Sequence, residues 1–135
     1  MEFYLLMATL TVHVLAGVFW AGSTSAMANL GSAEAIRLFP FQMGSAALTI
    51  LAGLVLWYFQ LGAQFHTHEQ ILLAGIAAAI IAAAIQGNII GRARRARATT
   101  ANAQTAIVDR VTTANRVAAG LLIVTVACMM IARFY

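Results

Sequence analysis

The sequence has no lysine and little charge of either sign: 9% of its 135 residues are charged, whereas 62% are hydrophobic. Soluble globular domains carry charge on about a quarter of their residues, and disordered segments are poor in apolar residues. Neither class fits this chain. The mean hydropathy of +0.87 indicates instead an integral membrane protein.

Cysteine and proline each occur once, and acidic residues four times. The single Cys128 cannot form an intrachain disulfide, and its position in an apolar run predicts a packed thiol. None of the acidic residues lies in the middle of an apolar run, and the chain has no phosphate-binding loop and no nucleophile paired with a base. These absences argue against a hydrolase.

Long apolar stretches fill most of the chain, and each reaches the roughly 20 residues that a membrane-spanning helix needs. They cover residues 3–30, 41–62, 70–91 and 111–132. Little of the chain is left for a soluble domain. The sequence therefore predicts one all-α domain over residues 1–135, a four-helix integral membrane bundle whose main partner is the lipid bilayer.

The connections between these spans differ in composition. Gly31 and the charged residues that follow predict a first loop over 31–37, and Pro40 suits the first turn of the second span, where its missing N–H costs nothing. Residues 64–69 predict the second loop. The segment 92–110 contains no glycine or proline and is rich in alanine and arginine, which favour helix. We therefore expect spans three and four to extend past the bilayer as an antiparallel helical hairpin.

Arginines are distributed unevenly between the two ends of the predicted bundle. The end with both termini and residues 62–70 carries Arg133, and the opposite end carries Arg37, Arg92, Arg94, Arg95, Arg97, Arg110 and Arg116. Because an excess of positive charge marks cytoplasmic loops, we expect both termini outside (N-out, C-out) and the arginine-rich hairpin in the cytoplasm. This distribution favours a multi-pass protein of the cytoplasmic membrane and argues against nucleic-acid binding.

His13 is the one ionisable residue deep within a predicted span. It lies about 15 Å from the outer end of the first span, close to the membrane midplane. Gly17 and Trp20 follow at i+4 and i+7 on the same helical face, where a glycine leaves space and an indole forms a flat wall. This face suits a planar cofactor or a metal. The alternative is structural, with His13 hydrogen-bonded to a backbone carbonyl or to Thr125 and with Gly17 at a helix contact.

The segment from His13 to Ser23, His-Val-Leu-Ala-Gly-Val-Phe-Trp-Ala-Gly-Ser, resembles the first-helix signature of a loose group of bacterial membrane proteins. The group includes copper-resistance D proteins, the membrane part of cytochrome c-linked urate oxidases and the HemJ type of protoporphyrinogen oxidase. In several members the first-helix histidine is implicated in haem or metal binding. The resemblance thus implies that His13 binds haem or a metal, and the haem expected in a redox-linked role is haem b. The chain has Ser23-Thr24-Ser25 where the HemJ type has Leu-Pro-Arg, so the oxidase activity is not carried over.

A haem on His13 lacks an obvious second ligand. At the same predicted depth the other spans place residues 51–53, 79–81 and 122–125, and none of these is histidine, methionine or cysteine. Such a haem is expected to be five-coordinate or to take its second ligand from another chain or molecule.

A second set of candidate ligands lies at the outer end. His66 and His68 are separated by one residue, so both face the same way in an extended loop. Met7, Met129 and Met130 are expected a turn or two below, and thioethers suit Cu(I). These residues predict an outer copper site. The alternative is an ordinary polar loop.

Three functions follow from these patterns. The first is a haem-binding or redox-linked membrane protein that uses His13, the second is a copper-binding or copper-transport protein, and the third is a non-catalytic accessory subunit of a larger membrane complex. Gly87 and Gly91 form a GxxxG motif in the third span. The motif predicts close packing inside the bundle or, alternatively, the contact face of a homo-oligomer.

Overall fold

The computed structural model describes residues 1–60, 67–96 and 100–134. In these ranges the chain forms four α-helices: α1 (Glu2–Leu30), α2 (Ser32–Gln60), α3 (Thr67–Arg95) and α4 (Ala101–Ala132). Each helix is long and apolar enough to cross a membrane. The predicted all-α class with four helices is therefore confirmed, and the length and apolar character of these helices suggest a multi-pass membrane protein.

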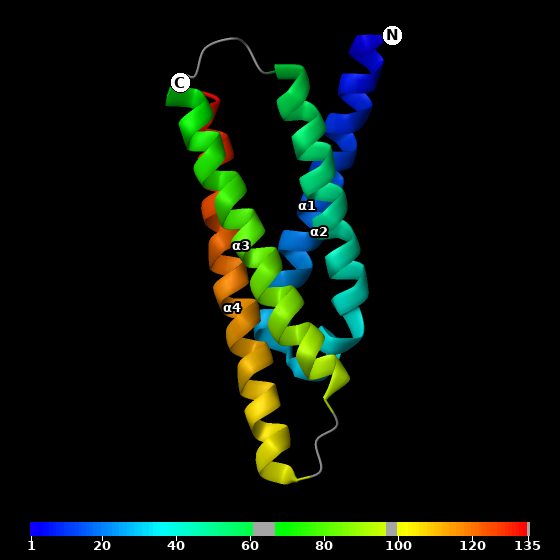
Figure 1. Ribbon diagram of the computed structural model, residues 1–135, viewed down its shortest axis with the longest axis vertical. Coiled ribbons are helices and arrows are strands. Elements are labelled where there is room, and N and C mark those ends of the chain that lie inside the picture. The colour runs from blue at the N-terminus through cyan, green and yellow to red at the C-terminus, as the bar shows by residue number, and fades with distance from the viewer. Residues whose placement is uncertain (61–66, 97–99, 135) are drawn as a thin grey trace.

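The helices form two antiparallel pairs, α1 with α2 and α3 with α4, and contacts within each pair are the most extensive in the bundle. Figure 1 shows the pairs close together at the end where α1 meets α2, called here the turn end. They lie apart at the other end, called the terminal end, which holds both chain termini. Packing between the pairs is thus concentrated toward the turn end.

Buried apolar side chains form the core in two groups. The first joins all four helices and consists mainly of alanines: Trp20, Ala46, Ala79, Ala82, Ala118 and Leu122. The second lies nearer the turn end and comprises Met27, Ala35, Ile90, Val111 and Ala114. Small residues let helix backbones approach closely, which is how helices associate in lipid. By contrast, α1 has no buried residue before Ala16.

The outer surface of the bundle is apolar. Only 11% to 33% of the most apolar segment of each helix is buried inside the bundle. Large side chains such as Leu15, Leu51, Ile80 and Ile123 are at least half exposed. An apolar surface of this kind needs a covering, and a lipid bilayer supplies one for all four helices.

The first connection is a single residue. Gly31 has a φ of 122°, which a side chain would strain, and α2 begins directly after it at Ser32. The predicted loop over 31–37 is therefore wrong. Pro40 lies inside α2 and not in its first turn. Because proline has no N–H, the Ile36 carbonyl lacks its helical partner, and the first turns of α2 run at an angle to the rest of the helix (Figure 1).

The other two connections differ from each other. The predicted loop over 64–69 is too long, because α3 already begins at Thr67. The predicted helical extension of spans three and four is confirmed, since α3 continues to Arg95 and α4 begins at Ala101. The start of α4 is capped by the Thr100 hydroxyl, which accepts the Ala103 N–H at 3.1 Å.

Candidate functional site

His13 faces α2, where two features hold its ring. Its Nδ1 lies 2.8 Å from the carbonyl oxygen of Thr49. The ring packs against Gly53, at which a Cβ would come within 2.9 Å of His13 Cε1. Because a carbonyl only accepts hydrogen bonds, Nδ1 carries a proton, and in the neutral imidazole the lone pair is then on Nε2. The interhelical bond to a backbone carbonyl is therefore present, whereas Thr125 bonds elsewhere, to the Gly75 carbonyl at 3.1 Å.

The second ring nitrogen of His13 remains available. Within the described ranges, His13 Nε2 has no hydrogen-bond partner. The fully buried polar atoms without a partner in this part of the chain are Gln42 Oε1 and Asn115 Nδ2, so His13 Nε2 keeps some accessible surface. The side chain as a whole is partly buried. Histidines that bind metals commonly donate one N–H to a carbonyl and use the other nitrogen as the ligand. His13 has this arrangement.

Gly17 and Trp20 are each occupied by other contacts. A Cβ on Gly17 would lie 3.5 Å from Thr49 Cγ2, so the Thr49 side chain fills the space beside this glycine. Trp20 is 1% exposed, and its Nε1 donates to Gln86 Oε1 at 2.8 Å in the core. Of the three residues predicted to share a site, Trp20 is buried in the core, Gly17 lies against Thr49, and His13 keeps a ring nitrogen without a hydrogen-bond partner in the described residues.

Buried amides form a polar network that was not among the residues predicted from the sequence. Gln86 is its centre, with an exposure of 0%. Besides accepting from Trp20, Gln86 donates from Nε2 to Thr24 Oγ1 at 3.0 Å and to Asn115 Oδ1 at 3.1 Å. One side chain of α3 thus links α1 and α4. The signal for it was an amide inside an apolar run, since such groups hydrogen-bond across helices in lipid.

Gln42 is a further fully buried amide, on α2. Its Nε2 lies 3.4 Å from Ser23 Oγ, a long contact. In the described part of the chain Gln42 Oε1 and Asn115 Nδ2 are buried without a hydrogen-bond partner. Each such atom adds to the free-energy cost of burying the amide that carries it.

At the terminal end, His68 lies in the first turn of α3 and not in an extended loop. Its Nδ1 is 2.5 Å from the Ala132 carbonyl oxygen, at the last residue of α4. The carbonyls at a helix C-terminus lack partners within the helix. His68 therefore ties the ends of α3 and α4 together.

The other predicted copper ligands are only partly gathered. Met129 and Met130 lie in the last turns of α4, near the helix end that His68 contacts. Met7 belongs to α1, whose first turns lie apart from that end in Figure 1. His66 lies outside the described residues. In the described ranges no three His, Cys, Asp or Glu residues are grouped so as to hold a metal, and the copper site stays a prediction.

Comparison of the chain with protein-family models, with curated proteins and with solved structures gives no match. The resemblance carried by the His13 segment therefore stays a prediction. The function is argued below from the geometry.

Proposed function

We propose that the protein is a small multi-pass membrane protein that binds haem b through His13 Nε2 and takes part in electron transfer. The observation that supports this proposal is the hydrogen bond of 2.8 Å between His13 Nδ1 and the Thr49 carbonyl oxygen. It orients the imidazole, selects the tautomer with a lone pair on Nε2 and makes this nitrogen a better donor to a metal.

The residues around His13 fit a metal-bound imidazole at α2. Gly53 leaves room for the ring where any Cβ would collide with it. Thr49 both accepts the Nδ1 proton and fills the space beside Gly17, so the proposal does not use Gly17 or Trp20 as the wall of the site. When bound, the haem would supply a one-electron couple whose potential depends on its axial ligands.

The proposal includes a partner. The neighbours of His13 on α2, Thr49 and Gly53, offer no further side chain that would hold the haem. A second protein ligand would come from a second copy of this chain or from a larger membrane complex. The helix pairs lie apart at the terminal end (Figure 1), and the apolar first turns of α1 are exposed there. These turns can contact such a partner.

The first test is spectroscopic. Wild-type protein expressed with ample haem and purified in a mild detergent should show a Soret band, and His13→Ala should lose it, because the only proposed protein ligand is removed. Circular dichroism checks that the variant keeps its helices. A colourless wild type, or a His13→Ala variant with an undiminished Soret band, overturns the haem proposal. The colourless outcome favours an accessory subunit.

A pair of glycine variants separates ligation by His13 from a loss of folding. Gly53→Ala places a Cβ 2.9 Å from His13 Cε1, so the ring must move away from Thr49. Loss of such an orienting bond lowers metal affinity roughly 10–100-fold. Gly44→Ala is the control on the same helix, because a Cβ there meets nothing within 4 Å. Equal haem content in both variants would contradict the orienting role of Thr49.

We further propose the orientation with both termini outside a bacterial cytoplasmic membrane, from the arginines at the turn end. Ala96, at the end of α3, is exposed. In a Cys128→Ala background, Ala96→Cys should resist an impermeant maleimide in intact cells and react after permeabilisation. Phe3→Cys, at the opposite end, should react in intact cells. Labelling of Ala96→Cys from outside reverses the orientation.

A further inference from the structure

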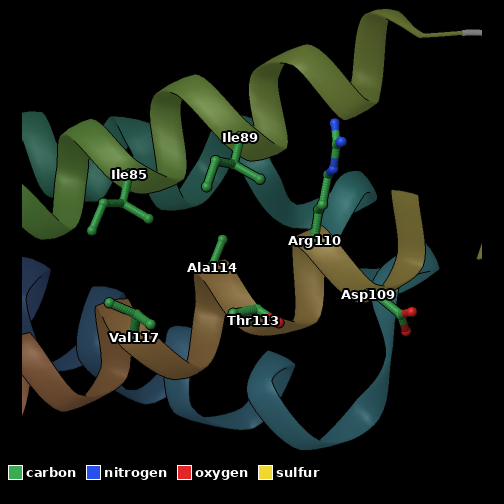
Figure 2. Close-up of a pocket in the computed structure, with 7 residues that line it drawn as sticks. All are labelled: Ile85, Ile89, Asp109, Arg110, Thr113, Ala114 and Val117. Carbon is green, nitrogen blue, oxygen red and sulfur yellow. The ribbon is translucent and has the colours of Figure 1, made fainter. Parts of the chain in front are cut away.

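An open groove lies between α3 and α4 toward the turn end. Its volume is about 380 Å³, and it is lined by Ile85, Ile89, Asp109, Arg110, Thr113, Ala114 and Val117. Figure 2 shows the isoleucines pointing from α3 toward α4, where Ala114 and Val117 complete an apolar floor. The groove takes no part in the proposed haem site, which lies between α1 and α2.

Arg110 gives the groove a positive end. In Figure 2 its side chain extends from α4 toward the last turns of α3, whereas the Asp109 carboxylate points away from the groove. Arg110 is exposed, and the described residues offer it no hydrogen bond or ion pair. The last turn of α3 adds the positive charges of Arg92, Arg94 and Arg95. A negatively charged ligand is therefore favoured at this end.

The groove has the right depth for a lipid. Val117 lies two helical turns along α4 from Arg110, about 10 Å deeper into the predicted span. One leaflet contributes about 15 Å of hydrocarbon. Arg110 directly precedes the predicted span 111–132 and so lies at the level of lipid headgroups. The apolar floor then faces acyl chains of the leaflet on the arginine-rich side.

We propose that this groove binds an anionic glycerophospholipid, with the phosphate on Arg110 and an acyl chain along Ile85, Ile89 and Val117. The arginine fork matches phosphate oxygens in charge and geometry. Basic sites between membrane helices bind anionic headgroups in this way. Thr113 also lines the groove, and its hydroxyl can donate a hydrogen bond to the headgroup.

The test compares two lipids that differ only in headgroup. Full-length protein is equilibrated in micelles that contain phosphatidylglycerol and phosphatidylcholine with identical chains, and the retained lipid is identified by native mass spectrometry. Wild type should prefer phosphatidylglycerol by about five-fold, the contribution of one arginine near an anionic surface. Arg110→Gln should lose this preference. Arg133→Gln should keep the preference for phosphatidylglycerol. Arg133 is also exposed, but it lies at the C-terminal end of α4, away from the groove.

A second pair of variants tests the acyl-chain part. Val117→Trp fills the groove. Val124→Trp is the control, because Val124 does not line the groove and its side chain is 49% exposed, close to the 46% of Val117. Only Val117→Trp should reduce retention of phosphatidylglycerol. Millimolar inorganic phosphate should not displace the lipid, because it lacks the chain that occupies the floor.

Three results would overturn the lipid site. The first is no headgroup preference in the wild type, and the second is an equal effect of Arg110→Gln and Arg133→Gln, which indicates general surface charge. The third is displacement by inorganic phosphate together with an unaffected Val117→Trp variant, which indicates a phosphate site without a bound chain.

Discussion

Replacing Gln86 by leucine is expected to lower the free energy of unfolding by about 2–4 kcal/mol. The substitution leaves Trp20 Nε1 and Asn115 Oδ1 buried without the partner that each has in the wild type. A buried polar group without a partner costs about 1–3 kcal/mol. Leucine is similar in size to glutamine, so the loss reports the hydrogen bonds and not a large cavity. Unfolding in mixed micelles of sodium dodecyl sulfate and a mild detergent, followed by circular dichroism, measures the effect.

Asn88→Leu is the matched control for Gln86→Leu. Asn88 lies half a turn further along α3, is exposed, and bonds only to the Ala84 carbonyl of its own helix at 2.9 Å. Its replacement should change stability by less than about 0.5 kcal/mol, as surface substitutions usually do. In a Trp57→Phe background, the emission of Trp20 should change in Gln86→Leu and not in Asn88→Leu. Equal stability of the two variants would mean that the network contributes little.

Ala82→Leu is expected to have a comparable or larger effect, through overpacking. Ala82 is 0% exposed in the group where all four helices meet. Three additional carbon atoms have no space there and must push α3 away from its neighbours, at a cost of about 1–3 kcal/mol. Ala82 lies one turn from Gln86, so this displacement also strains the hydrogen bonds of the network. We expect a loss of about 3 kcal/mol in the same unfolding assay, and aggregated protein in size-exclusion chromatography.

Ala84→Leu is the control for this substitution. Ala84 lies on the same helix and is exposed, so a leucine there adds apolar surface that lipid or detergent covers. This variant should unfold like the wild type. If Ala82→Leu is equally stable and monodisperse, the alanine core is less tightly packed than the burial of Ala82 indicates.

The spanning helices and the length of α3 and α4 could be predicted from the sequence, because both depend on local properties. About 20 apolar residues in a row suit the thickness of a bilayer wherever they occur in the chain. Continuous helix from residue 92 to 95 and from 101 to 110 follows from the absence of glycine and proline there. The start of α2 was not predicted, because the charged residues after Gly31 resemble a loop while being compatible with helix.

The candidate sites depended on contacts between helices. His13 was identified because a lone imidazole in an apolar span needs a partner. The sequence could not predict that its partner is the Thr49 carbonyl, because every residue of α2 has a carbonyl. Only the register of α1 against α2 brings one of them to His13. The same register brings Gly53, which carries no sequence signal of its own, under the ring.

From the sequence alone follow four helices that are long and apolar enough to cross a membrane and the gathering of most arginines at one end, and the sequence predicts His13 near mid-membrane. The packing of the helices against one another placed Trp20 in the core and made Gln86 the link between three helices. The same packing also decided that Arg110 stands over an apolar groove. Hydropathy and helix propensity act along the chain, whereas hydrogen bonds and grooves between helices depend on the rotation and relative height of each helix. Those two quantities follow from the packing of many small side chains at once.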